Sequence, residues 1–521
     1  MNSRKTRWIG VLAAVLVASI LIIYRFFFWS EPPDPTQRVR TIQNPVLPAV
    51  FPRNFQFGFA TVGYQSEGAL RANGSKVASN WSEWEEMGKI DRGQTSDHGC
   101  GFLGGYEAEL DRAVALGATS FSYAIDWARL EPAPGRFDKA ELKRIVAIVK
   151  AMRARKLKPL IVLFHWVTPA WVQSPKTGVD LLSRPDRAFV DAFLPVVDYV
   201  VPALAPLVDD WVTFEEPWTI VGGGYIEGVH PPGHHLDFAA GKRALVNLMY
   251  LNAGVYHRIH KLDTLDADGD GVAAFVGFET IAVDPVPMRL KRAADIDAAA
   301  RVDYVANRHF INAITKGVVD MDFNIETEKQ TDAFKERVPE LEHTLDFIGI
   351  NYYQRIRVEG GGILGPLSPV KGTPHIDTRE YDRDAPHSDM YEEIAPDGLR
   401  RVIEELAAYK LPLVITENGI SDARDDRRPC YLLEHLYTVA RAIADGYDVR
   451  GYYFWTLSDN FEWNLGVDAR YGLFSVDFSK PDLKRTRVRS ADLFEAIART
   501  RRIDRTLWDK FTLPAYPIGP L

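Results

Sequence analysis

Cysteine is scarce in this sequence, and positive charge is not in excess. The 521 residues include two cysteines, Cys100 and Cys430, which are too few for a disulfide framework or a four-cysteine zinc site. The 62 lysines and arginines face 70 aspartates and glutamates, so the formal net charge is −8. The chain therefore lacks the general positive field with which many proteins bind nucleic acid, and no nucleic-acid partner is expected.

The composition is otherwise ordinary. There is no repeat of fixed period and no low-complexity segment. With 46% apolar and 25% charged residues, disordered, collagen-like and all-membrane chains are excluded.

One long uncharged run lies near the N-terminus. Residues 8–24 contain no charged side chain, and as a helix they would span roughly 25 Å, enough to cross a thin bilayer. Bulky aromatic residues come next at 24–29, where a signal peptide would have small residues before its cleavage site. We therefore expect residues 1–29 to be an uncleaved transmembrane anchor, with a cleaved signal peptide as the alternative.

The residues on either side of this run predict its orientation and the start of the globular part. Arg4, Lys5 and Arg7 precede it, which places the N-terminus in the cytoplasm and the rest of the chain on the periplasmic or extracellular side. Six prolines lie between Ser30 and Pro52; they disfavour a helix and predict an extended linker over residues 30–52. Residues 53–521 are then one globular domain.

Short β-branched or aromatic runs alternate with longer amphipathic segments in this domain. Such alternation predicts parallel strands covered by helices, and eight strands suit a closed barrel. The fold expected is a single (β/α)8 TIM barrel with elaborated loops after the strands, preceded by one transmembrane helix. The expected strands are 56–61, 119–125, 160–164, 210–214, 273–278, 346–351, 413–416 and 451–455. The expected helices are 106–116, 139–155, 187–205, 241–261, 297–315, 398–409 and 431–445.

Polar and aromatic residues come directly after several of these strands. Glu215 and Glu216 end the fourth strand, and Glu417 comes after the seventh. The carboxyl ends of barrel strands hold the chemistry of such folds. The other strand ends and the segment shortly after the eighth strand supply imidazole, amide, phenol, indole and carboxyl groups: His165, Trp166, Asn351, Tyr353, Trp455, Glu462 and Trp463. Carboxylates ringed by aromatic side chains suit a sugar, because aromatic faces pack on C–H surfaces while polar edges bind hydroxyls.

Ordered motifs on these strand ends resemble those of glycoside hydrolase family 1, the retaining β-glycosidases. The resemblance extends from Phe51 to about Arg499. The matching segments are FQFGFAT at 55–61, YQSEG at 64–68, FHW at 164–166, TFEEPW at 213–218, DFIGINYY at 346–353, ITENG at 415–419 and WTLSDNFEW at 455–463.

The resemblance implies a role for each matching residue. Glu216 would be the general acid/base and Glu417 the nucleophile, with Tyr353 hydrogen-bonded to the nucleophile. The expected substrate-binding set is Gln65, His165, Trp166, Glu215, Tyr353, Trp455, Glu462 and Trp463. No cofactor or metal is implied, and the substrate would be a β-glycoside, either a small molecule or a glycolipid. Double displacement needs an ionised nucleophile beside a protonated acid, so we expect opposed environments for Glu417 and Glu216.

Two positions depart from the family pattern. Glu215 stands where the family has an Asn directly before its acid/base, and when ionised it accepts but cannot donate hydrogen bonds. Ser122 stands where the family has an Arg that faces the nucleophile. Loss of that cation should raise the pKa of the nucleophile.

Three functions stay open on this sequence. The first is a membrane-anchored retaining exo-β-glycosidase, β-glucosidase-like, for which Glu462 favours a neutral over a phosphorylated sugar. The second is a membrane-bound transglycosylase that moves sugar between glycolipids. The third is a sugar-binding homologue whose catalysis Glu215 and Ser122 have weakened.

One further motif resembles the start of a calcium loop. The segment DADGDG at 266–271 has acidic residues at the first, third and fifth positions, but the twelfth position is Gly277, where such loops carry a bidentate glutamate. A surface turn is therefore the favoured interpretation.

Overall fold

The computed structural model describes residues 44–320, 336–360, 371–373, 387–390 and 392–512, together with Ser19 and Ile42. Apart from Ser19, the expected anchor over residues 1–29 lies outside the described residues, as does most of the expected linker. Within the described ranges, no helix has both the length and the apolar character needed to cross a membrane. The anchor, its orientation and the boundary at residue 53 stay predictions.

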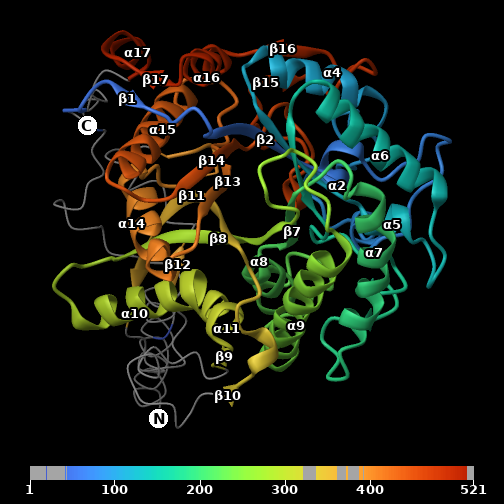
Figure 1. Ribbon diagram of the computed structural model, residues 1–521. Coiled ribbons are helices and arrows are strands. Elements are labelled where there is room, and N and C mark those ends of the chain that lie inside the picture. The colour runs from blue at the N-terminus through green and yellow to red at the C-terminus, as the bar shows by residue number, and fades with distance from the viewer. Residues whose placement is uncertain are drawn as a thin grey trace, which may run out of the picture.

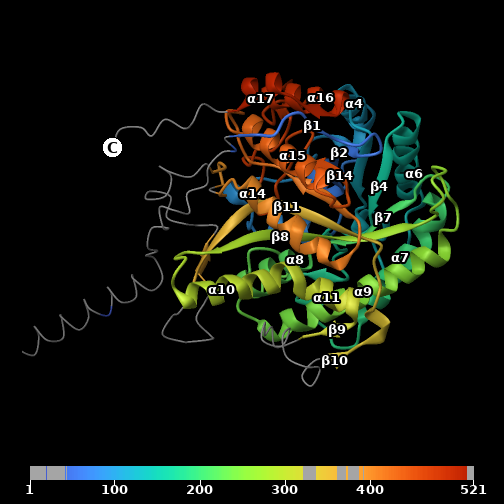
Figure 2. The same ribbon diagram turned by 60° about the vertical axis from the view of Figure 1, so that its left-hand side comes forward.

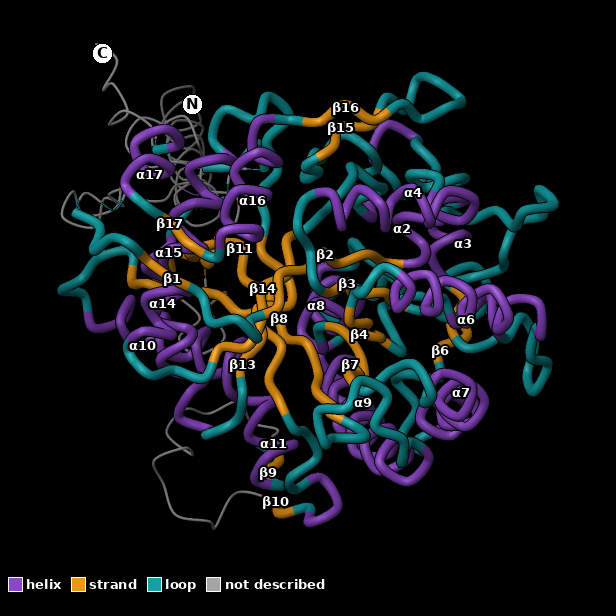
Figure 3. Tube along the Cα trace, turned by 45° about the horizontal axis from the view of Figure 1, so that its top comes forward, coloured by secondary structure: helices purple, strands orange, loops and turns teal. Residues whose placement is uncertain are grey.

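Eight parallel strands close into a barrel, as the sequence predicted. In space they keep the chain order, and pairing of β8 with β11 completes the ring. Figure 3 shows the strands at the centre of the molecule with helices around them. The barrel strands are β2 (Gln56–Val62), β3 (Ser120–Ala124), β4 (Lys158–Val162), β7 (Asp210–Glu215), β8 (Phe275–Pro287), β11 (Phe347–Glu359), β13 (Leu413–Asn418) and β14 (Val449–Phe454).

Helices cover the outside of this barrel (Figure 1). All seven expected helices are present, although residues 297–315 are divided by the π-helical turn η4 (Tyr304–His309). The described helices are α2 (Gly63–Glu67), α3 (Asn80–Glu86), α4 (Phe102–Ala115), α5 (Trp127–Leu130), α6 (Lys139–Ala154), α7 (Ala188–Leu204), α8 (Pro217–Val221), α9 (Phe238–Leu262), α10 (Ala293–Asp303), α11 (Phe310–Lys316), α14 (Pro396–Leu406), α15 (Arg428–Ala444), α16 (Arg489–Thr500) and α17 (Arg505–Phe511).

Short strands lie outside the barrel. The antiparallel pair β1–β17 brings the two ends of the described domain together (Figure 1), and Figure 2 shows β1 beside α16 and α17. These minor strands are β1 (Ala49–Val50), β5 (Gln173–Ser174), β6 (Val179–Asp180), β9 (Val318–Val319), β10 (Glu336–Arg337), β12 (Lys371–Thr373), β15 (Phe474–Val476), β16 (Arg485–Arg487) and β17 (Arg502–Ile503).

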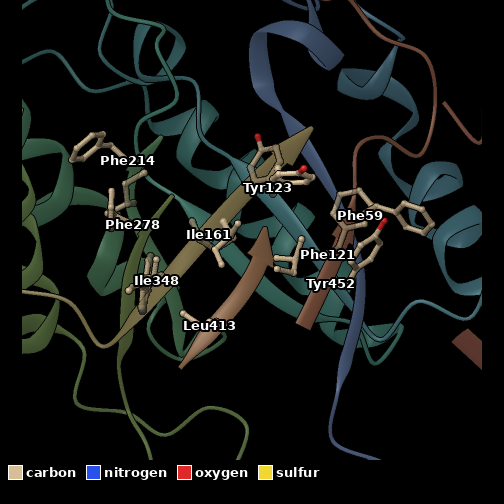
Figure 4. Packing of buried hydrophobic residues seen from close by; sticks show 14 of the residues in the cluster. Phe59, Phe121, Tyr123, Ile161, Phe214, Phe278, Ile348, Leu413 and Tyr452 are labelled. Atoms are coloured by element: carbon tan, nitrogen blue, oxygen red, sulfur yellow. The ribbon is translucent and has the colours of Figure 1, made fainter. Parts of the chain in front are cut away.

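Alternation along the strands produces two separate apolar layers. Phe59, Phe121 and Tyr452 belong to the layer between strands and helices, which is the larger core cluster (Figure 4). Ala60, Ala124 and Val162, which alternate with the residues of the first layer, belong to a second cluster. This cluster includes side chains of the barrel interior and of segments after the strands. Because successive side chains of a strand point to opposite faces, a residue two positions from Ala124, such as Ser122, also faces the interior.

A buried ion pair fixes the loop after β2. Glu67, whose side chain is fully buried, accepts two hydrogen bonds from the Arg144 guanidinium, each of 2.8 Å, and a third of 2.8 Å from the Tyr123 hydroxyl. Arg144 also contacts Glu141. Removing one partner of a buried pair leaves an uncompensated charge, which costs more than the pair itself contributes.

We therefore expect Glu67→Gln to lower the free energy of unfolding by about 3 kcal/mol, because Arg144 would keep only Glu141 as its acidic partner. Urea unfolding followed by circular dichroism measures this loss. The matched control is Glu495→Gln, in a partly exposed pair with Arg499, which should cost less than about 1 kcal/mol. Equal losses in the two variants would show that the buried pair has no special role.

Candidate active site

The strand carboxyl ends meet around one cavity. All ten residues in the site set expected from the sequence line it, which brings together side chains from Gln65 to Trp463. Thr219, His230, Ile281, Met390, Glu392, Asn464, Leu465 and Tyr471 also line the cavity. None of the described lining residues is a lysine or an arginine.

Two glutamates in this cavity accept hydrogen bonds from side chains on β11 and α8. Glu216 accepts one of 2.8 Å from the Asn351 amide and one of 2.6 Å from the Thr219 hydroxyl. Glu417 accepts a hydrogen bond of 2.6 Å from the Tyr353 hydroxyl. Asn351 pairs in register with Glu417 across β11 and β13, so this one asparagine connects the strand of Glu417 to the side chain of Glu216.

A second pair of carboxyl groups lies directly beside the first. Glu215 at the end of β7 and Glu279 on β8 are both buried, and burial raises the pKa of each. The negative charge of Glu279 raises the pKa of Glu215 further, while Glu279 itself has a pKa of about 7. Asn351 donates to Glu215 as well as to Glu216. At neutral pH the Glu215–Glu279 pair therefore retains a proton that exposed glutamates would lose.

The pKa pattern of the first pair differs from the sequence expectation. Burial raises the pKa of Glu216 and also that of Glu417, to which the charges of Glu216 and Glu279 add. The expected contrast, with an ionised Glu417 against a protonated Glu216, is thus not built into the pocket itself. Because the charge of Glu216 raises the pKa of Glu417, the titrations of the two carboxyl groups are linked.

The missing cation explains part of this pattern. Ser122 is 3% exposed and faces the barrel interior, at the position where the resemblance drawn from the sequence implies an arginine. Because no described lysine or arginine lines the pocket, another cation does not replace it there. The carboxyl groups are then neutralised by protons instead.

Part of the cavity lining consists of polar and aromatic side chains that contact one another. Glu462 accepts hydrogen bonds of 3.4 Å from Gln65 and 3.3 Å from the Trp455 indole, and burial raises its pKa to about 8. The Trp463 ring packs against Trp166 with centroids 4.8 Å apart. This surface offers both hydrogen-bonding edges and apolar faces, the combination that sugars require.

Three pocket residues adopt the left-handed backbone region that glycine favours. They are Trp166 with φ 63°, Glu216 with φ 41° and Trp463 with φ 51°. Such conformations cost on the order of 1–3 kcal/mol each and concentrate at functional sites. These three backbone conformations therefore lower the free energy of unfolding while they set the direction of the side chains.

Sequence reasoning missed several residues of the site, above all Glu279 and Glu392. Glu279 comes directly after the expected strand 273–278, and the same signal that identified Glu216 and Glu417 would have found it. Glu392 lies in a loop far from any motif, and burial raises its pKa to about 7; nothing in its sequence neighbourhood indicated a role.

One subset of the pocket could hold a metal ion. Ligand atoms of His165, Glu215 and Glu417 lie within 4.8 Å of one another, and burial lowers the pKa of His165 to about 3, so its imidazole is neutral. The same three side chains are in the set expected to act on sugar.

Comparisons with known proteins agree with this geometry. The sequence model described as Glycosyl hydrolase family 1 matches residues 47–503. A "Beta-galactosidase" of Pyrococcus woesei is 28% identical over 515 residues, covering 88% of this chain and 99% of the relative. "Beta-glucosidase A" of Thermotoga maritima is 28% identical over 445 residues, covering 82% and 94%. A solved structure, "beta-glycosidase from Pyrococcus horikoshii", has a TM-score of 0.75 at 27% identity and covers 90% of this chain and 99% of that one.

The raised pKa of Glu279 predicts a pH-dependent stability. Protonation favours the fold when the folded pKa exceeds the unfolded value of about 4.3. The contribution of Glu279 is therefore complete below that value and is lost as the pH rises through about 7. The Tm of the wild type should fall between pH 5 and pH 8 as Glu279 loses its proton. In Glu279→Gln this fall should be smaller by on the order of 1–5 °C.

Differential scanning calorimetry at pH 5 and pH 8 measures this difference. Glu495→Gln is the control, because a hydrogen bond from Arg487 lowers the pKa of Glu495. The contribution of Glu495 is complete above about pH 5, so the slope of Tm against pH should not change. Identical slopes in wild type and Glu279→Gln would contradict the proton-sharing pair.

Proposed function

Because the chain belongs to glycosyl hydrolase family 1 over residues 47–503, it is a β-glycosidase, and we propose that it is a retaining enzyme that releases the terminal sugar of a β-glycoside. Glu216 is the general acid/base and Glu417 the nucleophile. The observation that carries this assignment is that both carboxyl groups line one cavity and are oriented by separate donors, Asn351 with Thr219 and Tyr353.

The reaction has two displacements. Glu417 attacks the anomeric carbon while Glu216 gives its proton to the departing glycosidic oxygen, so one C–O bond forms as another breaks. Water then attacks the glycosyl-enzyme, Glu216 takes a proton from that water, and Glu417 leaves. When the glycosidic oxygen binds beside Glu216, it becomes the acceptor for the proton of Glu216, and Glu417 reacts in its ionised form.

The Glu215–Glu279 pair supports this step electrostatically. A retained proton keeps the pair from carrying two negative charges next to Glu417. Full ionisation of all four groups would oppose the approach of a nucleophilic carboxylate. The pair thereby limits the effect of having Ser122 in place of a cation.

Cavity size supports action on a terminal residue. The cavity measures about 230 Å³, below the ~300–1,000 Å³ of typical ligand pockets, which fits one sugar ring better than a chain of several. Glu462, Gln65 and Trp455 form one hydrogen-bonded part of its lining. The aglycone then extends toward the open mouth.

The sugar that this pocket favours is uncharged. Its described lining holds five glutamates, at positions 215, 216, 392, 417 and 462, and no lysine or arginine. A phosphorylated sugar needs cations or many N–H donors, so a 6-phospho-glycoside is disfavoured. The names of the relatives suggest glucosides and galactosides as the first substrates to test.

The N-terminal run supports a membrane-attached enzyme. Residues 8–24 are uncharged and, as a helix, long enough to cross a thin bilayer; basic residues precede them, so the catalytic domain is proposed to lie on the extracytoplasmic side. Such attachment would hold the pocket near lipid head groups.

A second candidate function is sugar transfer between glycolipids. The loop that contains His230, a cavity residue, also exposes large apolar side chains: Val229 is 41% exposed, Leu236 58% and Phe238, at the start of α9, 59%. Leu236 is also held at φ 52°, a conformation unusual for leucine. Apolar groups beside a sugar pocket suit a lipid aglycone or a lipid acceptor.

The nucleophile assignment predicts a chemical rescue. Glu417→Gly should lower kcat on an aryl β-glycoside by roughly 10⁴-fold or more, because no group is left to form the glycosyl-enzyme. Sodium azide should restore turnover by attacking from the vacated side, and the product should be the α-glycosyl azide. NMR of the product measures its configuration.

The control for this experiment is Glu495→Gln, a surface change that should retain wild-type kcat with no azide effect. In the wild type, a 2-deoxy-2-fluoro glycoside should label Glu417 covalently, as mass spectrometry detects. Wild-type turnover in Glu417→Gly would remove Glu417 from the mechanism, and an unlabelled wild type without turnover would favour the weakened sugar-binding homologue.

The lipid candidate predicts a substrate-dependent defect. Replacing Val229, Leu236 and Phe238 together with Ser should lower the rate on vesicles of a monoglycosyl diacylglycerol by about tenfold or more, since burying one such side chain contributes ~1.5–3 kcal/mol. The kcat/KM for a soluble aryl glycoside should stay unchanged. Thin-layer chromatography separates free sugar from diglycosyl lipid, and equal effects on both substrates would exclude the loop as a lipid contact.

A further inference from the structure

The opposite end of the barrel holds an acidic cluster that the glycosidase chemistry does not use. Carboxylate oxygens of Asp209, Asp266 and Asp268 lie within 4.8 Å of one another. Asp209 directly precedes β7, while Asp266 and Asp268 belong to the loop between α9 and β8. Both segments lie at the amino ends of barrel strands, where residues serve stability and not catalysis.

Asp209 is the residue that separates this cluster from an ordinary acidic turn. It is 2% exposed, and its Oδ1 atom accepts a hydrogen bond of 2.7 Å from the amide of Ala267. Its Oδ2 atom is buried and has no hydrogen-bond partner among the described residues. A buried carboxylate oxygen without a hydrogen-bond partner costs free energy of folding. The Asp209 carboxylate also lies beside the carboxylates of Asp266 and Asp268.

The loop itself is built as the first half of a calcium loop. Asp266 accepts hydrogen bonds of 2.7 Å from the amide of Gly269 and 2.9 Å from that of Gly271. The twelfth position, Gly277, lies inside β8, where a Cβ atom would meet the Phe347 ring at 2.6 Å. A ligand at that sequence position is thus impossible, but Asp209 reaches the cluster from another segment.

The charges nearby neutralise only part of this cluster. The Lys158 ammonium lies 3.0 Å from Asp268 and 3.0 Å from Asp210, and 3.7 Å from Asp270. Arg153 donates to the carbonyl of Ala267. Within the described ranges, neither Asp209 nor Asp266 forms an ion pair with a lysine or an arginine, so two negative charges stay without a direct cationic partner.

We propose that Asp209, Asp266 and Asp268 bind one Ca²⁺ ion that fastens the loop before β8 to the start of β7. Oxygen ligands select a hard cation, and Ca²⁺ accepts irregular sets of ligands at 2.3–2.6 Å. Two ligands on opposite sides of the ion are then about 5 Å apart, and these oxygens, all within 4.8 Å of one another, are close enough to share one ion. Waters complete the shell on the exposed side. The two positive charges of one Ca²⁺ offset the negative charges of Asp209 and Asp266, while Lys158 forms the ion pair with Asp268.

The binding test uses the full chain, stripped of metal with EDTA, titrated with CaCl₂ in a calorimeter. One Ca²⁺ should bind per chain. Asp209→Asn keeps the acceptor for Ala267 but removes the charge, and it should weaken Ca²⁺ binding by roughly tenfold or more. Asp266→Asn should do the same. The control Asp482→Asn, on an exposed aspartate away from the cluster, should bind as the wild type does.

Further measurements separate this site from the catalytic pocket. Glu417→Gln should leave Ca²⁺ binding unchanged, because the pocket lies at the other end of the barrel. Saturating Ca²⁺ should raise the Tm of the wild type, and Mg²⁺ should raise it less, while kcat on an aryl glycoside stays constant. No heat of binding and no change in Tm at roughly 10 mM Ca²⁺, above the range of the weakest calcium modules, would overturn the proposal. Unchanged affinity in both Asp209→Asn and Asp266→Asn would overturn it as well.

Discussion

Burial of negative charge at the carboxyl end of the barrel is the constraint on which the chemistry of this protein depends. Glu215, Glu216, Glu279 and Glu417 are all buried, and their pKa values are all raised. Without a described lysine or arginine in the lining, protons and hydrogen bonds must stabilise these groups. Asn351 is central to that arrangement, since its amide donates to Glu215 and to Glu216 while its carbonyl accepts from Thr416 at 2.8 Å.

This constraint links electrostatics to catalysis. A retaining glycosidase needs one proton between two carboxyl groups, delivered in one step and recovered in the next. Burial raises the pKa of the proposed catalytic pair and of the neighbouring pair, so both pairs keep protons to a higher pH than exposed glutamates do. Because the raised pKa values come mainly from desolvation, anything that admits water to the cavity would alter the ionisation of the whole group.

Acidic side chains are stabilised differently at the two ends of the barrel. At the carboxyl end, the acids stay close and share protons because they act on a substrate. At the amino end, Lys158 neutralises Asp210 and part of the adjoining loop, and the remaining acids form an arrangement suited to a divalent cation. The layer between the strands and the helices is mainly apolar, although it includes the buried hydrogen bond from Thr213 on β7 to Asn252 on α9.

Local patterns in the sequence determined the eight strands, the helices that cover them and the motifs at the strand ends, because side-chain alternation and turn chemistry act over a few residues. They also determined the acidic pair Glu216 and Glu417, since each lies at the end of a strand. Glu279 carried the same signal and was nonetheless overlooked, whereas Glu392 had no local signal. Only the tertiary structure decided how these groups affect one another. The proton shared between Glu215 and Glu279, the lack of a lysine or arginine in the described pocket lining and the meeting of Asp209 with Asp266 all depend on distances between separate strands and loops, which spacing along the chain does not contain.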